Sequence, residues 1–194
     1  MSTSTNNKKV IVRVAEAGLL IALLVVVQLL TFVVPKSVPL VSQLFTGSLV
    51  NLVLIVGAAT VGFSGTALAA ILSPVLAFAF GQLLFPQMIP VVAIGNLVIV
   101  AVVWAFFRND VKLSKTTRLG IDIAGIVVGA AAKTAFLWAA TLWLIIPMFF
   151  SANATVSNKL SISFSWLQLI TALIGGILAL LVLPALRKYR SHRV

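Results

Sequence analysis

Lys133 is the only charged residue deep inside the long apolar stretches of this chain. It lies in the sequence Gly-Ala-Ala-Ala-Lys-Thr-Ala-Phe, with no Asp or Glu within ten residues on either side. A cation near the centre of a bilayer costs about 2.5–3.5 kcal/mol on insertion scales, so such a residue usually faces a cavity, a partner or a ligand. In an apolar pocket, its ammonium suits an anion, a carbonyl oxygen or a ring nitrogen.

Few other polar side chains lie inside the apolar stretches. Asn96 lies in the middle of one stretch, and Asn51 lies about two helical turns into another. We predict a mostly apolar substrate pocket with a few convergent polar groups, formed by Lys133, Asn51, Asn96, Gln43, Thr46, Ser48, Trp138 and Gln168. Simpler alternatives remain open. The asparagines could bond to a neighbouring helix, the tryptophan could anchor the protein at a membrane interface, and the lysine could reach backbone carbonyls.

Catalytic chemistry has little support in the sequence. Gly62-Phe63-Ser64-Gly65 fits the Gly-x-Ser-Gly pattern of intramembrane serine proteases, but a serine nucleophile needs a base, and the only histidine is His192 near the C-terminus. The chain has no cysteine and only three acidic residues. We therefore predict no catalytic residues, no metal site and no cofactor.

Composition places these residues in a membrane protein. The 194 residues are 61% hydrophobic and 9% charged, a balance that soluble domains do not show. Because a bilayer core requires about 20 apolar residues per helix, we predict an all-α membrane protein with six transmembrane helices, at residues 10–34, 45–62, 65–82, 86–107, 119–147 and 164–186. Residues 10–186 then form a single membrane domain, between a disordered cytoplasmic tail (1–9) and a basic cytoplasmic tail (187–194).

The positive charges predict the orientation. Eleven of the 14 Lys and Arg residues flank the predicted spans on one side, whereas the other side has Lys36 and Lys159. The positive-inside rule therefore places both termini in the cytoplasm, which requires an even number of spans, and six fits. We predict a multi-pass protein of the bacterial cytoplasmic membrane, in contact with lipid. Because the basic residues act as topology signals, we predict no binding to nucleic acid. Residues 35–44, 83–85 and 148–163 become outer loops.

Two local features have structural consequences. Pro74 lies inside a predicted span, where it removes a backbone hydrogen bond that a neighbouring helix or a serine hydroxyl must replace. Asp122 follows Arg118 by one helical turn, which predicts a local ion pair.

In size and topology the whole chain resembles the substrate-binding S component of an energy-coupling factor (ECF) vitamin transporter. Four local stretches are also similar to that superfamily: Thr46-Gly-Ser-Leu-Val-Asn51, Ser73-Pro-Val-Leu-Ala-Phe78, Ile94-Gly-Asn-Leu97 and Trp166-Leu-Gln-Leu169. The resemblance implies capture of a vitamin from outside, and release inward by toppling on a transmembrane coupling subunit powered by two cytoplasmic ATPases. It also implies docking through an Ala-x-x-x-Ala motif, whose nearest match is Gly18 with Ala22.

The substrate is less well defined by the sequence. A lysine beside two asparagines suits a carboxylate that also carries hydroxyl or amide groups, which favours pantothenate. Cobalamin and a pyridoxine- or hydroxymethylpyrimidine-like ring are the other candidates. The alternative to transport is a membrane scaffold or assembly protein, in which backbone carbonyls would satisfy Lys133.

Overall fold

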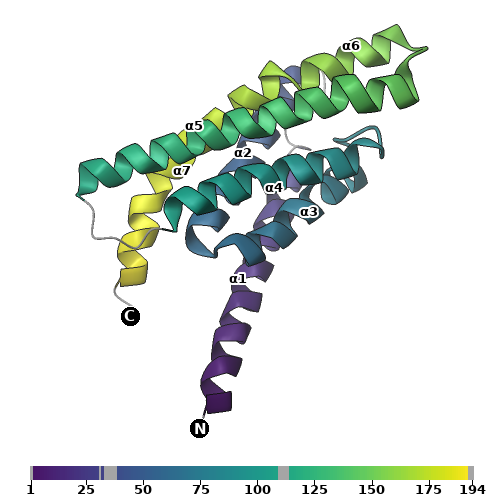
Figure 1. Cartoon of the computed structure of the whole chain (residues 1–194). Coiled ribbons are helices and arrows are strands. Elements are labelled where there is room, and N and C mark those ends of the chain that lie inside the picture. Colours follow the sequence, from purple (N-terminus) through teal and green to yellow (C-terminus); the bar gives the residue numbers. More distant parts are fainter. Residues whose placement is uncertain (1, 31, 33–38, 109–113, 192–194) are drawn as a thin grey trace.

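The fold is a bundle of helices (Figure 1). The computed structural model describes residues 2–30, 32, 39–108 and 114–191, in which all regular structure is helical. In chain order the elements are α1 (Ser2–Leu30), α2 (Pro39–Thr60), α3 (Phe63–Ala79), α4 (Met88–Phe107), α5 (Lys115–Ala140), the π-helix η1 (Thr141–Phe150), α6 (Ala154–Ser163) and α7 (Trp166–Ser191).

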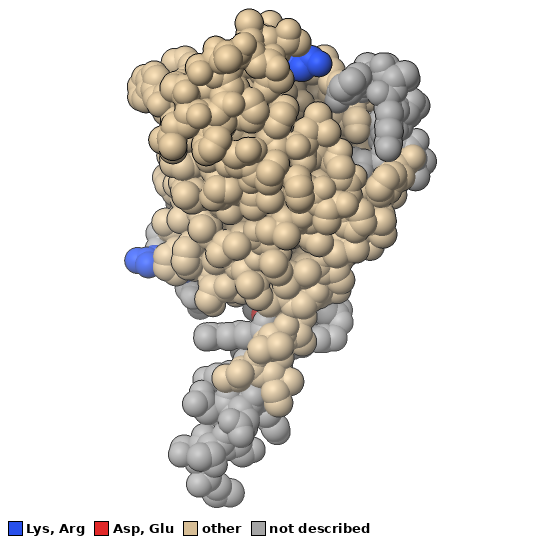
Figure 2. Space-filling view, turned by 90° about the vertical axis from the view of Figure 1, so that its right-hand side faces the viewer, with Lys and Arg blue, Asp and Glu red and all other residues tan. Residues whose placement is uncertain are grey.

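Most of these helices can cross a membrane. Five described segments are long and apolar enough: Val10–Leu30, Leu40–Thr60, Met88–Phe107, Lys115–Phe150 and Ala154–Lys188. Helix α3 is apolar but shorter, with 17 residues. On the face shown in Figure 2, charged side chains appear only near the edges of the coloured surface. The prediction of an all-helical protein with membrane-spanning helices is confirmed, and the third predicted span, 65–82, corresponds to the shorter α3.

Several predicted boundaries differ from the structure. Residues 2–9, predicted as a disordered tail, continue α1, because each residue added to an existing helix gains a backbone hydrogen bond without a new nucleation cost. Helix α2 begins at Pro39, inside the predicted loop 35–44, since proline is well suited to the first turn of a helix.

The predicted outer loop 148–163 is also mostly helical. Residues 148–150 belong to η1, and α6 follows after a short turn. The Asn153 side chain accepts a hydrogen bond from Val156 N at 3.1 Å and so caps α6. A polar sequence that reads as a loop therefore contains the start signal of a helix.

The orientation of the termini stays a prediction. In Figure 1 the start of α1 and the end of α7 lie away from α6, on the side where α4 ends and α5 begins. Three of the basic residues used in the charge count, Lys36, Lys112 and Arg193, lie outside the described residues.

Four helices form a ring around the bundle interior. Helices α4 and α7 each pack against both α2 and α5, while α1 and α3 cover the ring from outside α2 and α4. Glycines permit the close approaches. A Cβ at Gly175 of α7 would lie 2.6 Å from the Ser48 carbonyl oxygen of α2, and one at Gly176 would lie 2.2 Å from Ile126 of α5.

Two apolar clusters fill the bundle. The larger one includes Leu54, Ile99, Val103, Ile126, Ala130, Ala179 and Leu183. The smaller one, near η1 and α6, consists of Met88, Val91, Leu137, Ile145, Leu160 and Phe164. On α5, Lys133 lies between Ala130 of the larger cluster and Leu137 of the smaller one. The fold therefore places its buried cation at the junction of two apolar clusters.

We expect Gly175→Ala to destabilise the bundle, although alanine is normally the better helix former. The added Cβ would meet backbone atoms of α2, namely Ser48 O at 2.6 Å and Leu52 N at 2.8 Å, which cannot rotate away. The expected loss is about 1–3 kcal/mol, as for other overpacked sites. Thermal unfolding of the purified protein in detergent measures it.

Gly120→Ala is the matched control. A Cβ at Gly120 meets nothing within 4 Å, so the melting temperature should stay unchanged or rise slightly. Equal melting temperatures for the two variants would show that α2 and α7 do not depend on the close approach at Gly175.

Candidate functional site

The structure brings three of the predicted site residues into direct contact. Lys133 Nζ of α5 donates hydrogen bonds to Asn51 Oδ1 of α2 at 2.7 Å and to Asn96 Oδ1 of α4 at 2.8 Å. Lys133 is 3% exposed, and each asparagine is 1% exposed. We call these three residues the Lys133 centre. It joins three helices of the ring through an ammonium and two neutral oxygens.

The nitrogen of the Asn51 amide has two hydrogen-bond acceptors, which fix the orientation of the side chain. Its Nδ2 donates to Gly47 O at 2.9 Å and to Thr171 Oγ1 of α7 at 3.4 Å. The Thr171 hydroxyl uses its own hydrogen to donate to Gln168 O at 3.0 Å. Sequence reasoning missed Thr171, whose only signal is its position one turn after Gln168 on an apolar helix. Through Thr171, the fourth helix of the ring supports the centre.

Asn96 is held by a carbonyl of α3. Its Nδ2 donates to Ala70 O at 3.3 Å. Ala70 precedes Pro74 by four residues, and proline has no N–H to donate to that carbonyl. The predicted compensation for the proline therefore comes from a neighbouring helix. The same bond turns the oxygen of the Asn96 side chain towards Lys133.

The centre lacks an anionic partner among the described residues. The ion pairs found in that part of the chain involve Asp122 and not Lys133. Two amide oxygens accept two of the three N–H groups of the ammonium. They stabilise the cation through charge-assisted hydrogen bonds but do not neutralise it. The arrangement can therefore bind a further acceptor, and an anion most strongly.

The remaining polar residues of the predicted pocket have other contacts. Gln43 and Gln168 both donate through Nε2 to Ser163 O at 3.1 Å, which ties α2 and α7 to the end of α6. Thr46 and Ser48 are buried, and their hydroxyl oxygens have no hydrogen-bond partner among the described residues. Because buried hydroxyls normally have partners, these two remain candidates for ligand contacts.

Trp138 lies away from the Lys133 centre. It follows Lys133 by five residues, which places it about 140° around α5. Its side chain is 46% exposed, and its ring centroid lies 6.4 Å from that of Trp143, which is 76% exposed. The structure therefore supports the alternative reading of these tryptophans as anchors at a membrane interface.

The predicted docking residues lie on an open face of α1. Gly18 and Ala22 are both exposed, and a Cβ built at Gly18 meets no atom within 4 Å. In contrast, Leu20 and Leu24 are buried against the larger apolar cluster. A partner could therefore approach the small residues without displacing the core.

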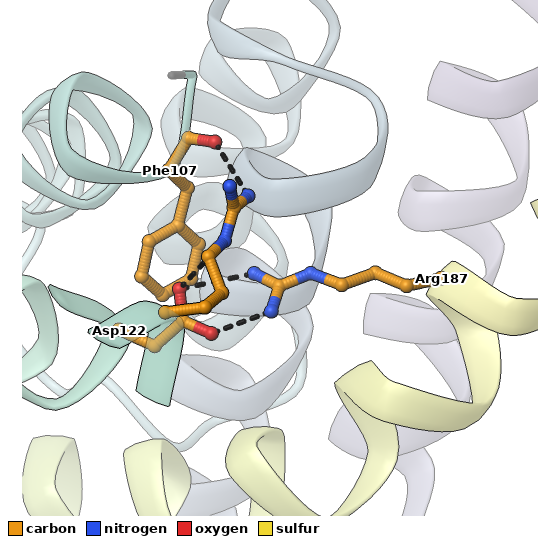
Figure 3. A network of polar contacts seen from close by, with 4 residues as sticks. Phe107, Asp122 and Arg187 are labelled. Atoms are coloured by element: carbon orange, nitrogen blue, oxygen red, sulfur yellow. Dashed lines mark hydrogen bonds and ion pairs between the residues drawn. The ribbon is translucent and has the colours of Figure 1, made fainter. Parts of the chain in front are cut away.

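An ion-pair cluster connects the beginning of α5 to the last part of α7 (Figure 3). Arg187 of α7 binds the Asp122 carboxylate through both terminal nitrogens, at 2.5 and 3.1 Å. Arg118 lies 3.6 Å from the same carboxylate and donates to Phe107 O at 3.1 Å. The Arg187 guanidinium lies over the Phe107 ring, 5.5 Å from its centroid. The predicted Arg118–Asp122 pair on α5 is confirmed, and Arg187, which was not predicted, extends it to α7.

We expect Asp122→Asn to destabilise the bundle, because it leaves two arginines without their anionic partner. Breaking a buried ion pair typically costs about 3–5 kcal/mol, and we expect about 1–3 kcal/mol here since both arginines are partly exposed. Thermal unfolding in detergent measures the loss.

Arg187→Lys keeps the charge but cannot form the paired contact, so it should lose stability to a smaller extent. If both variants melt like the unmodified protein, the ion pair does not hold α5 to α7.

Comparisons with known proteins add an independent observation. Residues 12–187 match a protein-family model described as the substrate-specific component of ECF transporters. The matched range runs from α1 into α7 and includes the whole Lys133 centre. The comparisons with curated proteins and with solved structures gave no significant match.

Proposed function

The chain belongs to the family of substrate-specific components of ECF transporters, and from this premise we propose that it captures a vitamin-like small molecule from outside the cell at the Lys133 centre. Delivery inward would then take place while the protein is docked on a coupling subunit with two ATPases. The observation that carries the assignment of the site is the buried ammonium, which contacts two helices inside the ring.

The energetics of Lys133 favour a role in binding. Burying a cation lowers stability unless its partners compensate, and well-packed apolar residues often serve a structural role equally well. In a scaffold protein the lysine would serve only to link helices, and a buried charge that is not neutralised within the described part of the chain is unfavourable for that role. A subunit that binds an acceptor-bearing molecule gains affinity from the same residue.

Pantothenate is our first candidate for the substrate. It has one carboxylate for Lys133, together with hydroxyl and amide groups that suit buried polar side chains such as Thr46 and Ser48. Cobalamin and pyridoxine or hydroxymethylpyrimidine are the other candidates, because their amide or ring-nitrogen acceptors could also accept from an ammonium.

We expect native mass spectrometry of the purified protein to show a retained small molecule that Lys133→Met loses. Methionine keeps an unbranched side chain, one heavy atom shorter than lysine, and removes the donors that hold the ligand. The mass of the adduct identifies the substrate.

Lys159→Met is the matched control, because Lys159 is exposed on α6 and the same substitution there should leave the adduct in place. An adduct equally present in both variants would place the site elsewhere in the protein. If no adduct is found and a panel of vitamins gives no thermal shift, the scaffold function becomes the better explanation.

Docking on a coupling subunit is expected to use the open face of α1. We expect Gly18→Leu combined with Ala22→Leu to abolish co-purification with the coupling subunit and the ATPases, because the larger side chains keep the partner helix at a distance. Ligand binding by the isolated protein should be retained, since both residues lie outside the bundle interior.

Gly120→Leu, at an exposed position on α5, controls for the added bulk. A complex that still forms with the α1 variant would show that another face docks.

A further inference from the structure

We propose that the Lys133 centre selects its ligand by charge, and that the substrate carries a carboxylate or similar single anionic group that accepts from the remaining N–H of Lys133. This inference rests on the proposed capture function and narrows its substrate class. It depends on the direction in which the two amides are held and on the lack of a counter-charge near Lys133 among the described residues.

The Asn51 amide can offer only its oxygen to the centre. Lysine has donors and no acceptor, so the atom that it contacts must be Oδ1. On the other side, the Gly47 carbonyl can only accept, and the Thr171 hydroxyl has already given its hydrogen to Gln168 O. Turning the amide round would face Nδ2 with an ammonium and Oδ1 with a carbonyl, so neither contact would survive.

The Asn96 amide is fixed by the same logic. Its Nδ2 faces Ala70 O, the carbonyl that Pro74 leaves without an intrahelical donor. The proline on α3 thus sets the orientation of a side chain on α4, which presents its oxygen to Lys133 on α5. Pro74 acts as a positioning residue for the ammonium, although it does not touch it.

No carboxylate in the described part of the chain neutralises Lys133. Asp122 lies on the same helix, but it precedes Lys133 by about 16 Å of helical rise and is bound to Arg187 and Arg118. The centre therefore has one positive charge, two fixed neutral acceptors and one remaining donor. An anion gains a charge-assisted hydrogen bond there, whereas a cation is repelled and a neutral ring gains less.

The test compares ligands that differ only in charge. The full chain, purified in detergent, is titrated calorimetrically with pantothenate and its alcohol pantothenol, biotin and biotinamide, and nicotinate and nicotinamide, with thiamin and pyridoxine as cationic and neutral probes. We expect one acid to bind and its neutral counterpart to bind about tenfold to a hundredfold more weakly, the range for a hydrogen bond to a charged group.

Asn51→Asp tests the cause of the selectivity. The new carboxylate has the same shape and supplies a counter-charge to Lys133. The oxygen that replaces Nδ2 loses the contact with Gly47 O, and the Thr171 hydroxyl can rotate to donate to it. We expect this variant to lose its preference for the acid over the neutral compound. Lys133→Met should bind the acid no more tightly than the neutral compound, and it keeps the test decisive if Asn51→Asp does not fold.

The outcomes separate this inference from the proposed function. If the neutral member of a pair binds as tightly as the acid, or if only thiamin or pyridoxine binds, charge selection is wrong while capture stands. If no compound binds and no molecule co-purifies, the capture function fails and charge selection fails with it. If Asn51→Asp keeps the full preference for the acid, the charge on Lys133 is not its source.

Discussion

An ammonium held away from water requires acceptors, and this requirement organises the centre of the bundle. Lys133 obtains two oxygens, from Asn51 and Asn96, and each asparagine needs a partner for its nitrogen. Those partners come from Gly47 and Thr171 on one side and from Ala70 on the other. One buried charge therefore links α3, α4, α5, α2 and α7 in a single chain of hydrogen bonds.

The same hydrogen bonds compensate for the proline in α3 and fix the orientation of an amide side chain. A proline inside a helix normally leaves a carbonyl without a donor, and in an apolar surrounding that carbonyl is costly. Here Asn96 meets this need at Ala70, and the bond determines which end of the amide faces Lys133. Gly175 contributes in another way, because the absence of a side chain brings α7 close enough to α2 for Thr171 to reach Asn51.

The sequence predicts the residues of the Lys133 centre because polar side chains inside apolar helices must find partners or ligands. Contacts between segments that are distant in the sequence cannot be predicted in this way. Arg187 lies 65 positions from Asp122, and Thr171 lies 120 from Asn51, so no local spacing indicates either pair. Trp138 was placed in the pocket on depth alone, and depth does not determine which face of a helix a residue occupies. Residues 148–163, the end of η1 and all of α6, are predicted as a loop because they follow the apolar stretch and include several polar residues.

The two ends of the ring differ in a way that bears on transport. Between the Lys133 centre and the Asp122 ion pair the interior is filled by apolar side chains, among them Ile126, Val103 and Leu183. Towards η1 and α6 the buried hydroxyls of Thr46 and Thr141 lack hydrogen-bond partners among the described residues. A further buried hydroxyl without a partner among the described residues, that of Thr66, lies beside Gly57 of α2. In the proposed function, the apolar side chains between the Lys133 centre and Asp122 would leave delivery of the ligand inward to the coupling subunit on which the protein docks.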